Sequence, residues 1–150
     1  MIVTRYAKPA LIAANANKAS GDSFFQEAPK LDDLRDLPGF TYLGQPFTMY
    51  QHGHRAAAYD GARAAAKLIE RGFRVFAPIP HSHRIAEVGN LSQTDHALWE
   101  YQDKPFVDAA SSLIVLMLPG WDRSRGLAHE IDEFEKARKP VVYVSLSDLD

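Results

Sequence analysis

The continuous apolar run SLIVLML at residues 112–118 constrains the fold more than any other feature of the sequence. A strand that is open to solvent on one face alternates apolar and polar residues, whereas a strand covered on both faces is apolar throughout. Three shorter β-rich runs lie elsewhere in the chain: FTYLG at 40–44, FRVFA at 73–77 and VVYVS at 141–145. Gly or Pro residues bound each of them, as expected for short strands. We therefore expect a sheet that is buried on both faces.

Helix-forming segments separate these runs. Residues 54–71 are rich in Ala, the strongest helix former. A second helix is expected over residues 93–110, with Ser92 as its N-cap and Pro105 as a point where it kinks or divides. A third is expected over residues 125–138. The apolar faces that the spacing predicts are Ala58, Ala62, Ala65 and Ile69 in the first helix and Leu127, Ile131 and Phe134 in the third.

The alternation of strands and helices is typical of a parallel sheet with crossover helices. The sequence predicts an α/β fold: a three-layer, Rossmann-like or flavodoxin-like parallel sheet of about four to five strands, with helices on both faces. Residues 39–150 form this domain. Residues 1–38 show no sustained period and are interpreted as a solvated N-terminal extension. Within that extension, MIVTRYA is compatible with a short strand, and the acidic residues of 29–38 with one helical turn.

The composition excludes several classes of protein. The chain has 17 Lys and Arg against 19 Asp and Glu, a formal charge of −2, so it lacks the basic footprint of a nucleic-acid-binding protein. It has no Cys, which excludes disulfides, thiolate zinc sites and a Cys nucleophile. The apolar run falls far short of the ~20 residues that span a bilayer. We expect a cytoplasmic protein with no membrane or nucleic-acid-polymer partner.

Several common motifs are missing. No G-x-G-x-x-G follows the first strand, and neither a P-loop nor a G-x-S-x-G elbow is present, which disfavours dinucleotide binding, P-loop chemistry and serine-hydrolase chemistry. The pair at residues 129–130 lacks the second His of a zinc protease. HGH at 52–54 and HSH at 81–83 lie in predicted loops, where alternate residues more often contact solvent or substrate. We predict no metal site and no organic cofactor.

Ligands of such sheets bind beyond the carboxyl ends of the strands. The loops expected there are residues 44–54, 78–92 and 119–124. The last of them leads into a helix whose N-cap is Ser124, and Gly126 leaves the surrounding backbone amides unobstructed. A helix N-terminus with free N–H groups can receive an anion or a hydroxyl group. The plainer alternative is that Ser124 only caps the helix.

Two carboxylates are candidates for chemistry at the same edge. Glu130 follows Ser124 by six residues, and Asp103 precedes the third strand by nine. Their elements converge on one cleft in this architecture, where one carboxylate could act as a nucleophile and the other as an acid or base. To act as an acid near neutral pH, Asp103 would need a raised pKa. The alternative for Glu130 is a solvated surface position.

A family resemblance connects these residues. The Y-L-G run at 42–44, Asp103 and the S-x-G-x-x-x-E pattern at 124–130 resemble the nucleoside 2-deoxyribosyltransferase superfamily. That superfamily includes the 2′-deoxynucleoside 5′-monophosphate N-glycosidases. Residues 42–145 also resemble a bacterial family of unknown function, DUF1937, within or beside it. The resemblance leaves the N-terminal extension outside.

The resemblance implies roles for four residues. Glu130 matches the glutamate that attacks the anomeric carbon, and Asp103 the aspartate that handles the proton at the nucleobase. Tyr42 matches the tyrosine that touches the catalytic glutamate or the sugar. Ser124 matches a position that meets the phosphate in the monophosphate glycosidases, which favours a phosphorylated ligand. The resemblance also implies a homodimer or higher homo-oligomer, since relatives complete their sites across an interface.

Further substrate contacts are expected from the predicted loops. Gly44, Gln45 and Arg55 belong to the loop after the first strand, which lacks the Ser and Arg that the monophosphate glycosidases place on the phosphate. His81 follows the second strand. Trp121 either stacks on a base or packs over the site mouth or the core.

Three functions remain open at this stage. The first is cleavage or transfer of an N-glycosidic bond in a nucleoside or nucleoside 5′-monophosphate. The second is a nucleotide- or nucleoside-binding module of the same fold without turnover. The third is a flavodoxin-like interaction domain.

Overall fold

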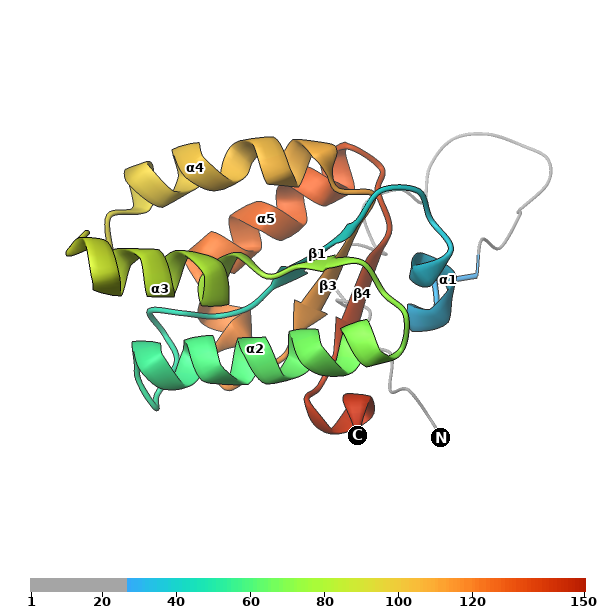
Figure 1. The fold of residues 1–150 in the computed structure, drawn as a ribbon. Helices are drawn as coiled ribbons and strands as arrows, with labels where there is room; N and C mark the ends of the chain where they lie inside the picture. Colours follow the sequence, from blue (N-terminus) through green and yellow to red (C-terminus); the bar gives the residue numbers. More distant parts are fainter. Residues whose placement is uncertain (1–26) are drawn as a thin grey trace.

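The sheet has four strands, all of them parallel. A computed structural model describes residues 27–150 of the chain (Figure 1). The strands are β1 (Thr41–Gly44), β2 (Val75–Phe76), β3 (Ser112–Leu116) and β4 (Val141–Val144), in the spatial order β2-β1-β3-β4. The predicted α/β fold with its parallel sheet is confirmed.

Helices cover both faces of this sheet (Figure 1). The α-helices are α1 (Leu31–Arg35), α2 (His54–Glu70), α3 (Pro78–Gly89), α4 (His96–Ala109) and α5 (Arg125–Lys136), and the short 3-10 helices are η1 (Trp121–Arg123) and η2 (Ser147–Leu149). Leu43 and Ile114 share one core with Leu68 of α2. Tyr42 and Leu113 share the opposite core with residues of α4 and α5. The result is three layers.

The register of the sheet decides which β1 side chains meet α5. Side chains of a strand point alternately to opposite faces. Tyr42 pairs with Leu113 and Gly44 with Val115, and Tyr42, Leu113 and Val115 all belong to the core under α4 and α5. Residues 42 and 44 therefore both face α5, at the carboxyl end of the central strand.

The described part of the N-terminal extension packs against the domain. The predicted helical turn is present as α1, where Leu31 and Leu34 are buried in the α2-side core, while Asp32 and Asp33 are exposed. This segment is therefore a core element and not a solvated lead-in. The predicted strand at residues 1–7 lies outside the described residues.

Two predictions for the middle of the chain were wrong. Residues 78–92, expected to be a loop, contain α3, because prolines at the start of a helix need no backbone N–H donor and suit the helical φ. The next helix begins at His96 rather than 93, with the Asp95 side chain in place of Ser92 accepting from Leu98 N at 3.1 Å. Pro105 lies inside α4 and does not divide it.

The prediction for α5 is confirmed, since Ser124 caps it and Leu127, Ile131 and Phe134 are buried. The face predicted for α2 was partly wrong: Ala58 is buried and Ala65 packs against the core, but Ala62 and Ile69 are exposed. The buried residues of α2 are Ala57, Ala58, Gly61, Ala64 and Leu68. Over residues 27–150, none of the helices has the length and apolar character needed to cross a membrane.

Candidate active site

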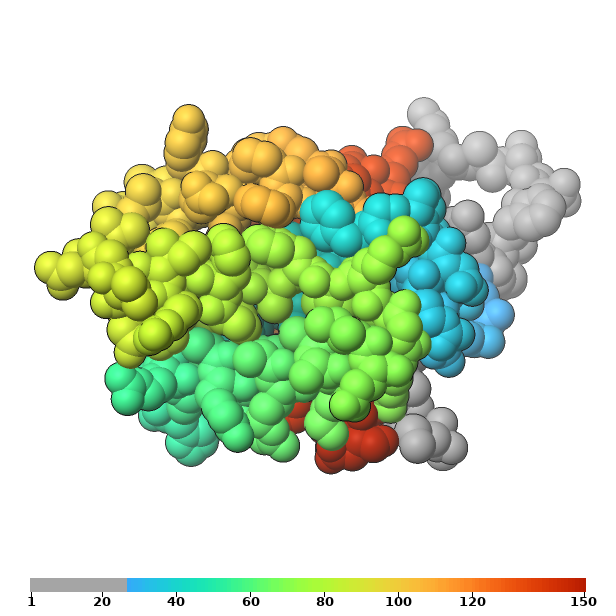
Figure 2. All heavy atoms as spheres, in the orientation of Figure 1, coloured from blue at the N-terminus to red at the C-terminus, as the bar shows by residue number. Residues whose placement is uncertain are grey.

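A cavity of about 410 Å³ lies between α3, α4, α5 and the start of the β1–α2 loop. Figure 2 shows the atoms of α3 between those of α2 and α4 on this face of the molecule. Residues from all three α/β crossovers line the cavity. The polar side chains among them include Tyr42, Ser82, His83, His96, Glu100, Asp103, Lys104, Ser124, Arg125, His129, Glu130 and Glu133.

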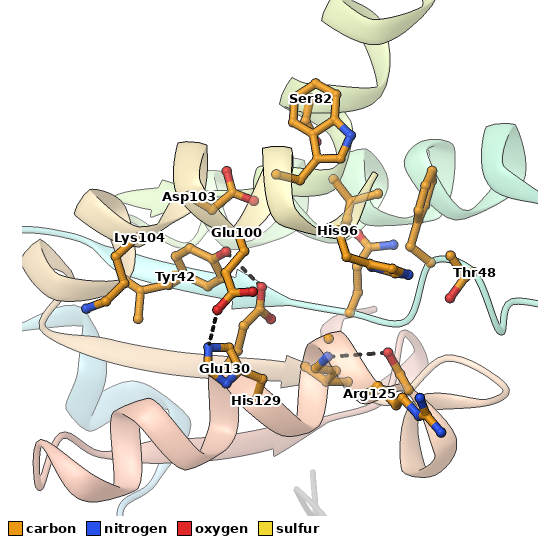
Figure 3. Close-up of a pocket in the computed structure, with 18 of the residues that line it drawn as sticks. Tyr42, Thr48, Ser82, His96, Glu100, Asp103, Lys104, Arg125, His129 and Glu130 are labelled. Atoms are coloured by element: carbon orange, nitrogen blue, oxygen red, sulfur yellow. Dashed lines mark hydrogen bonds and ion pairs between the residues drawn. The ribbon is translucent and has the colours of Figure 1, made fainter. Parts of the chain in front are cut away.

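Glu130 is held by a buried tyrosine. Tyr42 is fully buried, and its hydroxyl donates to Glu130 Oε1 at 2.8 Å (Figure 3). Burial raises the pKa of Glu130 to about 8, with the nearby Asp103 carboxylate adding to the rise and the Tyr42 hydrogen bond opposing it. Burial and the two carboxylates also raise the pKa of Tyr42, so this residue stays a hydrogen-bond donor. Tyr42 therefore stays neutral and orients the carboxyl group through this hydrogen bond.

Asp103 approaches the same site from α4. Its Oδ1 atom is buried and has no hydrogen-bond partner among residues 27–150. Loss of hydration raises the pKa of Asp103 to about 6, while the charge of His81 lowers it. In Figure 3 the Asp103 and Glu130 side chains extend from α4 and α5 on either side of the Tyr42 ring. A buried acceptor without a partner is costly unless a ligand supplies the missing hydrogen bond.

The other end of the cavity has the chemistry to receive an anion. Thr48, His96 and Arg125 lie there, away from Asp103 and Lys104 (Figure 3). Ser124 is buried, and its Oγ accepts from Leu127 N at 3.3 Å as the N-cap of α5. A Cβ at Gly126 would meet no atom of the described chain within 4 Å, so the first turn of α5 is open at that position. The helix dipole and the Arg125 guanidinium both favour negative charge here.

Two pairs of polar side chains connect α4 to α5 at the cavity. His129 Nε2 lies 3.2 Å from Glu100 Oε1, and Lys104 Nζ lies 3.7 Å from Glu133 Oε2. All four residues line the cavity. Sequence reasoning considered His129 only as part of a zinc-protease motif and did not single out the other three. Their spacing of four residues on each helix is the signal that would have placed them on the faces that carry Asp103 and Glu130.

Two aromatic side chains in the cavity wall, those of Trp99 and Phe47, contact neighbouring residues. Trp99 Nε1 donates to Ser92 O at 2.8 Å. Phe47 stacks on His54, with ring centroids 4.2 Å apart. His83, also in the wall, pairs through Nδ1 with Gln93 Oε1 at 2.9 Å. These contacts tie three side chains of the cavity wall to neighbouring residues.

The structure separates several predicted substrate contacts from the cavity. Arg55 is 86% exposed and pairs with Glu87 at 3.0 Å. His81 packs against Phe76 with ring centroids 5.5 Å apart, and its charge reaches Asp103. Trp121 packs against Tyr143, so the alternative in which it stacks on a base has no support. None of the three predicted residues is among the cavity-lining residues.

Gln45 and Gly44 were also expected to contact the substrate, but their side-chain positions contact the protein itself. Gln45 lines the cavity, but its amide donates to Ala57 O at 2.8 Å and so ties β1 to α2. Gly44 lies behind Glu130, because a Cβ on it would be 2.9 Å from Glu130 Oε2. By contrast, Tyr42, Asp103, Ser124, Gly126 and Glu130 all line one cavity. In the described part of the chain, His, Asp and Glu side chains form no group of three that could hold a metal ion.

Comparison with protein families gives one match. Residues 39–146 match the model of a domain of unknown function, DUF1937. The chain belongs to this family. The DUF1937 region begins just before β1 and ends just after β4, so it contains the whole sheet and every cavity residue named above. A search of curated proteins gave no match.

Proposed function

We propose that this DUF1937 protein cleaves or transfers the N-glycosidic bond of a nucleoside or nucleoside 5′-monophosphate. The observation that carries the proposal is the pair of half-buried carboxyl groups, Asp103 and Glu130, that face one cavity from different helices. Retaining glycosidases use such a pair, one as nucleophile and one as acid and then base. The buried Tyr42 hydroxyl orients the nucleophile.

The reaction has two steps. Glu130 attacks C1′ of the sugar, the bond from C1′ to the base nitrogen breaks, and Asp103 gives its proton to the leaving base. Water, or a second base, then attacks C1′ of the glycosyl-enzyme, and the Asp103 carboxylate takes the proton that is released. The bond between C1′ and Glu130 breaks, which restores the free carboxylate. No cofactor takes part in either step.

The opposite end of the cavity supports a phosphorylated substrate. Ser124, Arg125 and the open first turn of α5 line the same cavity as Glu130. With C1′ of the sugar at Glu130, we expect the 5′ phosphate to bind at this end. A phosphate binds well to helix N-terminal amides together with an arginine. We therefore expect nucleoside 5′-monophosphates to bind more tightly than the corresponding nucleosides.

The decisive experiment is incubation with a panel of nucleosides and 5′-monophosphates, with chromatography of the released free base. Glu130→Gln removes the nucleophile and keeps the shape, so we expect base release to fall by at least about 10³-fold while nucleotide binding persists. Glu135→Gln, on an exposed position of the same helix, is the matched control and should retain the wild-type rate. Base release that survives Glu130→Gln would contradict the assignment of the nucleophile.

A second candidate is a nucleotide-binding module without turnover. The observation that favours it is the raised pKa of Glu130, about 8, which leaves most of this carboxyl protonated and non-nucleophilic at neutral pH. Nucleotide-dependent thermal stabilisation without base release at any pH between about 5 and 9 would establish this alternative.

A further inference from the structure

Gly44 ends β1 directly behind the Glu130 side chain. It is buried, and it is not one of the residues that line the cavity. Its φ angle is not among the positive values of the described glycines, so the backbone at this position accepts any residue. The reason for a glycine here is therefore the space that a side chain would fill.

That space is occupied by Glu130 and its neighbours. A Cβ at residue 44 would lie 2.9 Å from Glu130 Oε2, 2.8 Å from Leu127 Cδ1 and 3.2 Å from Leu113 Cδ1. The first two distances are shorter than side-chain carbon atoms reach in folded proteins. A side chain at residue 44 and the present position of the Glu130 carboxyl group exclude each other.

The same strand holds the other oxygen of this carboxyl group. Tyr42 lies two residues before Gly44 on the same face of β1, and its hydroxyl donates to Oε1 at 2.8 Å. One carboxyl oxygen thus meets a hydrogen-bond donor, and the other meets bare backbone. Together the two positions determine where the carboxyl group lies relative to the sheet.

We propose that Gly44 is a positioning residue, whose missing side chain lets the Glu130 carboxyl group lie against β1 within reach of Tyr42. The proposal deepens the proposed function, on which its kinetic test rests. An alanine at this position pushes the carboxyl group away from the strand and from the Tyr42 hydroxyl. A displacement of this size moves a nucleophile out of line with its target carbon.

A double-mutant cycle between residues 44 and 130 tests the proposal. Gly44→Ala should lower kcat about 100-fold with little change in KM, because substrate binding does not involve Gly44. Glu130→Asp shortens the side chain by one methylene and draws the carboxyl group back toward α5. In the Glu130→Asp background, Gly44→Ala should therefore lower kcat by less than about threefold. If the loss of kcat in the double variant equals the product of the losses in the two single variants, the proposal is overturned.

The matched control is Gly89→Ala. Gly89 ends α3, and a Cβ there makes ordinary contacts with Leu91 at 3.6 Å and beyond. This variant should keep the wild-type kcat. Because a Cβ at residue 44 also meets Leu127, the cycle is repeated in the Leu127→Val background if Gly44→Ala fails to fold.

A second readout is independent of turnover. The pH titration of the Glu130 carboxyl carbon is followed by NMR and assigned by its absence in Glu130→Gln. Its midpoint should be lower in Gly44→Ala than in the wild-type protein, because regained hydration, the larger effect on the pKa of Glu130, outweighs the loss of the Tyr42 hydrogen bond. Gly89→Ala should leave it unchanged, and an unchanged midpoint in Gly44→Ala would refute the displacement. If the wild-type protein releases no base from any nucleotide, the proposed function fails, and this titration still decides the role of Gly44.

Discussion

At the scale of single residues, burial brings the titrations of Asp103 and Glu130 into the neutral range. Their pKa values rise to about 6 and about 8, and the Asp103 carboxylate adds to the rise at Glu130. Interacting groups titrate as a pair, so the pair carries one proton between these two values. These values place the proton mainly on Glu130, so the reactive form, with Glu130 ionised and Asp103 protonated, is the minor arrangement of this singly protonated state.

The first prediction is a bell-shaped dependence of kcat/KM on pH. The rate should rise through about pH 6, peak near pH 7 and fall above about pH 8, as the pair first loses one proton and then the other. Asp103→Asn removes the acid, so the rate should drop about 10²–10⁴-fold and the fall at high pH should disappear. Initial rates of base release between about pH 5 and pH 9 measure both effects. A flat profile in the wild-type protein would exclude this pair as the reacting groups.

The second prediction concerns stability. The pKa of Glu130 is higher in the folded chain, about 8, than its ordinary 4.5, so folding binds a proton in this range. This contribution to stability is fully present below about pH 4.5 and is lost as the pH rises through about 8. Glu130→Gln should thus be more stable than the wild-type protein near pH 8.5, on the order of 2–4 kcal/mol, with a much smaller difference near pH 4.5. Urea denaturation at both pH values tests this, and an equal difference at both would contradict it.

At the scale of secondary structure, one close approach joins β1 to α2. A Cβ at Gly61 would lie 1.7 Å from Gln45 Oε1 and 2.8 Å from Gln45 Cδ. The Gln45 side chain is buried there and donates to Ala57 O. The glycine in this Ala-rich helix therefore makes room for the amide that ties the helix to the sheet.

The third prediction follows from that contact. Although alanine favours helix formation, Gly61→Ala should lower the free energy of unfolding by about 1–2 kcal/mol, because it displaces Gln45 and breaks its hydrogen bond. Gly126→Ala is the matched substitution without a clash, since a Cβ there meets nothing within 4 Å. It should be neutral or raise the free energy of unfolding by up to about 1 kcal/mol. Chemical denaturation of both variants measures the contrast, and a stabilised Gly61→Ala would show that Gln45 moves without cost.

At the scale of the whole molecule, the core extends beyond the DUF1937 region. Leu31 and Leu34 of α1 precede residue 39, yet they pack with Leu68 and Phe73 in the α2-side core. Helix α1, which precedes the family region, is thus part of the same folding unit.

The fourth prediction tests this long-range packing. Leu34 is 2% exposed, so Leu34→Ala should lower the free energy of unfolding by about 2–4 kcal/mol. Leu98→Ala, at a position that is 39% exposed on α4, should cost less than about 1 kcal/mol. Thermal or urea unfolding of the two variants gives the comparison. Equal small losses would show that α1 contributes little to the core.

Local patterns were sufficient for much of the fold. The strands and the apolar face of α5 can be predicted from the apolar or polar nature of residues that are close together in the sequence. The Ala-rich α2 was the counterexample, since small apolar residues occur on nearly every side of it and the choice of buried face depends on the sheet beneath. Prolines at the start of α3 were read as ends of a strand because the same residues suit both places.

The sequence by itself determined the order of the four strands and of α2, α4 and α5, because apolar spacing and helix caps depend on residues a few positions apart. It missed α3, and it pointed to Asp103 and Glu130 through their spacing together with a family resemblance. Only the tertiary structure decided what surrounds those groups. The Tyr42–Glu130 hydrogen bond joins residues 88 positions apart, and it forms because strand register turns Tyr42 and Gly44 toward α5. Packing likewise turned Arg55 and Trp121 to other partners and placed Trp99 and His83 in the cavity wall. Such contacts arise from register and helix packing, which no short stretch of sequence contains.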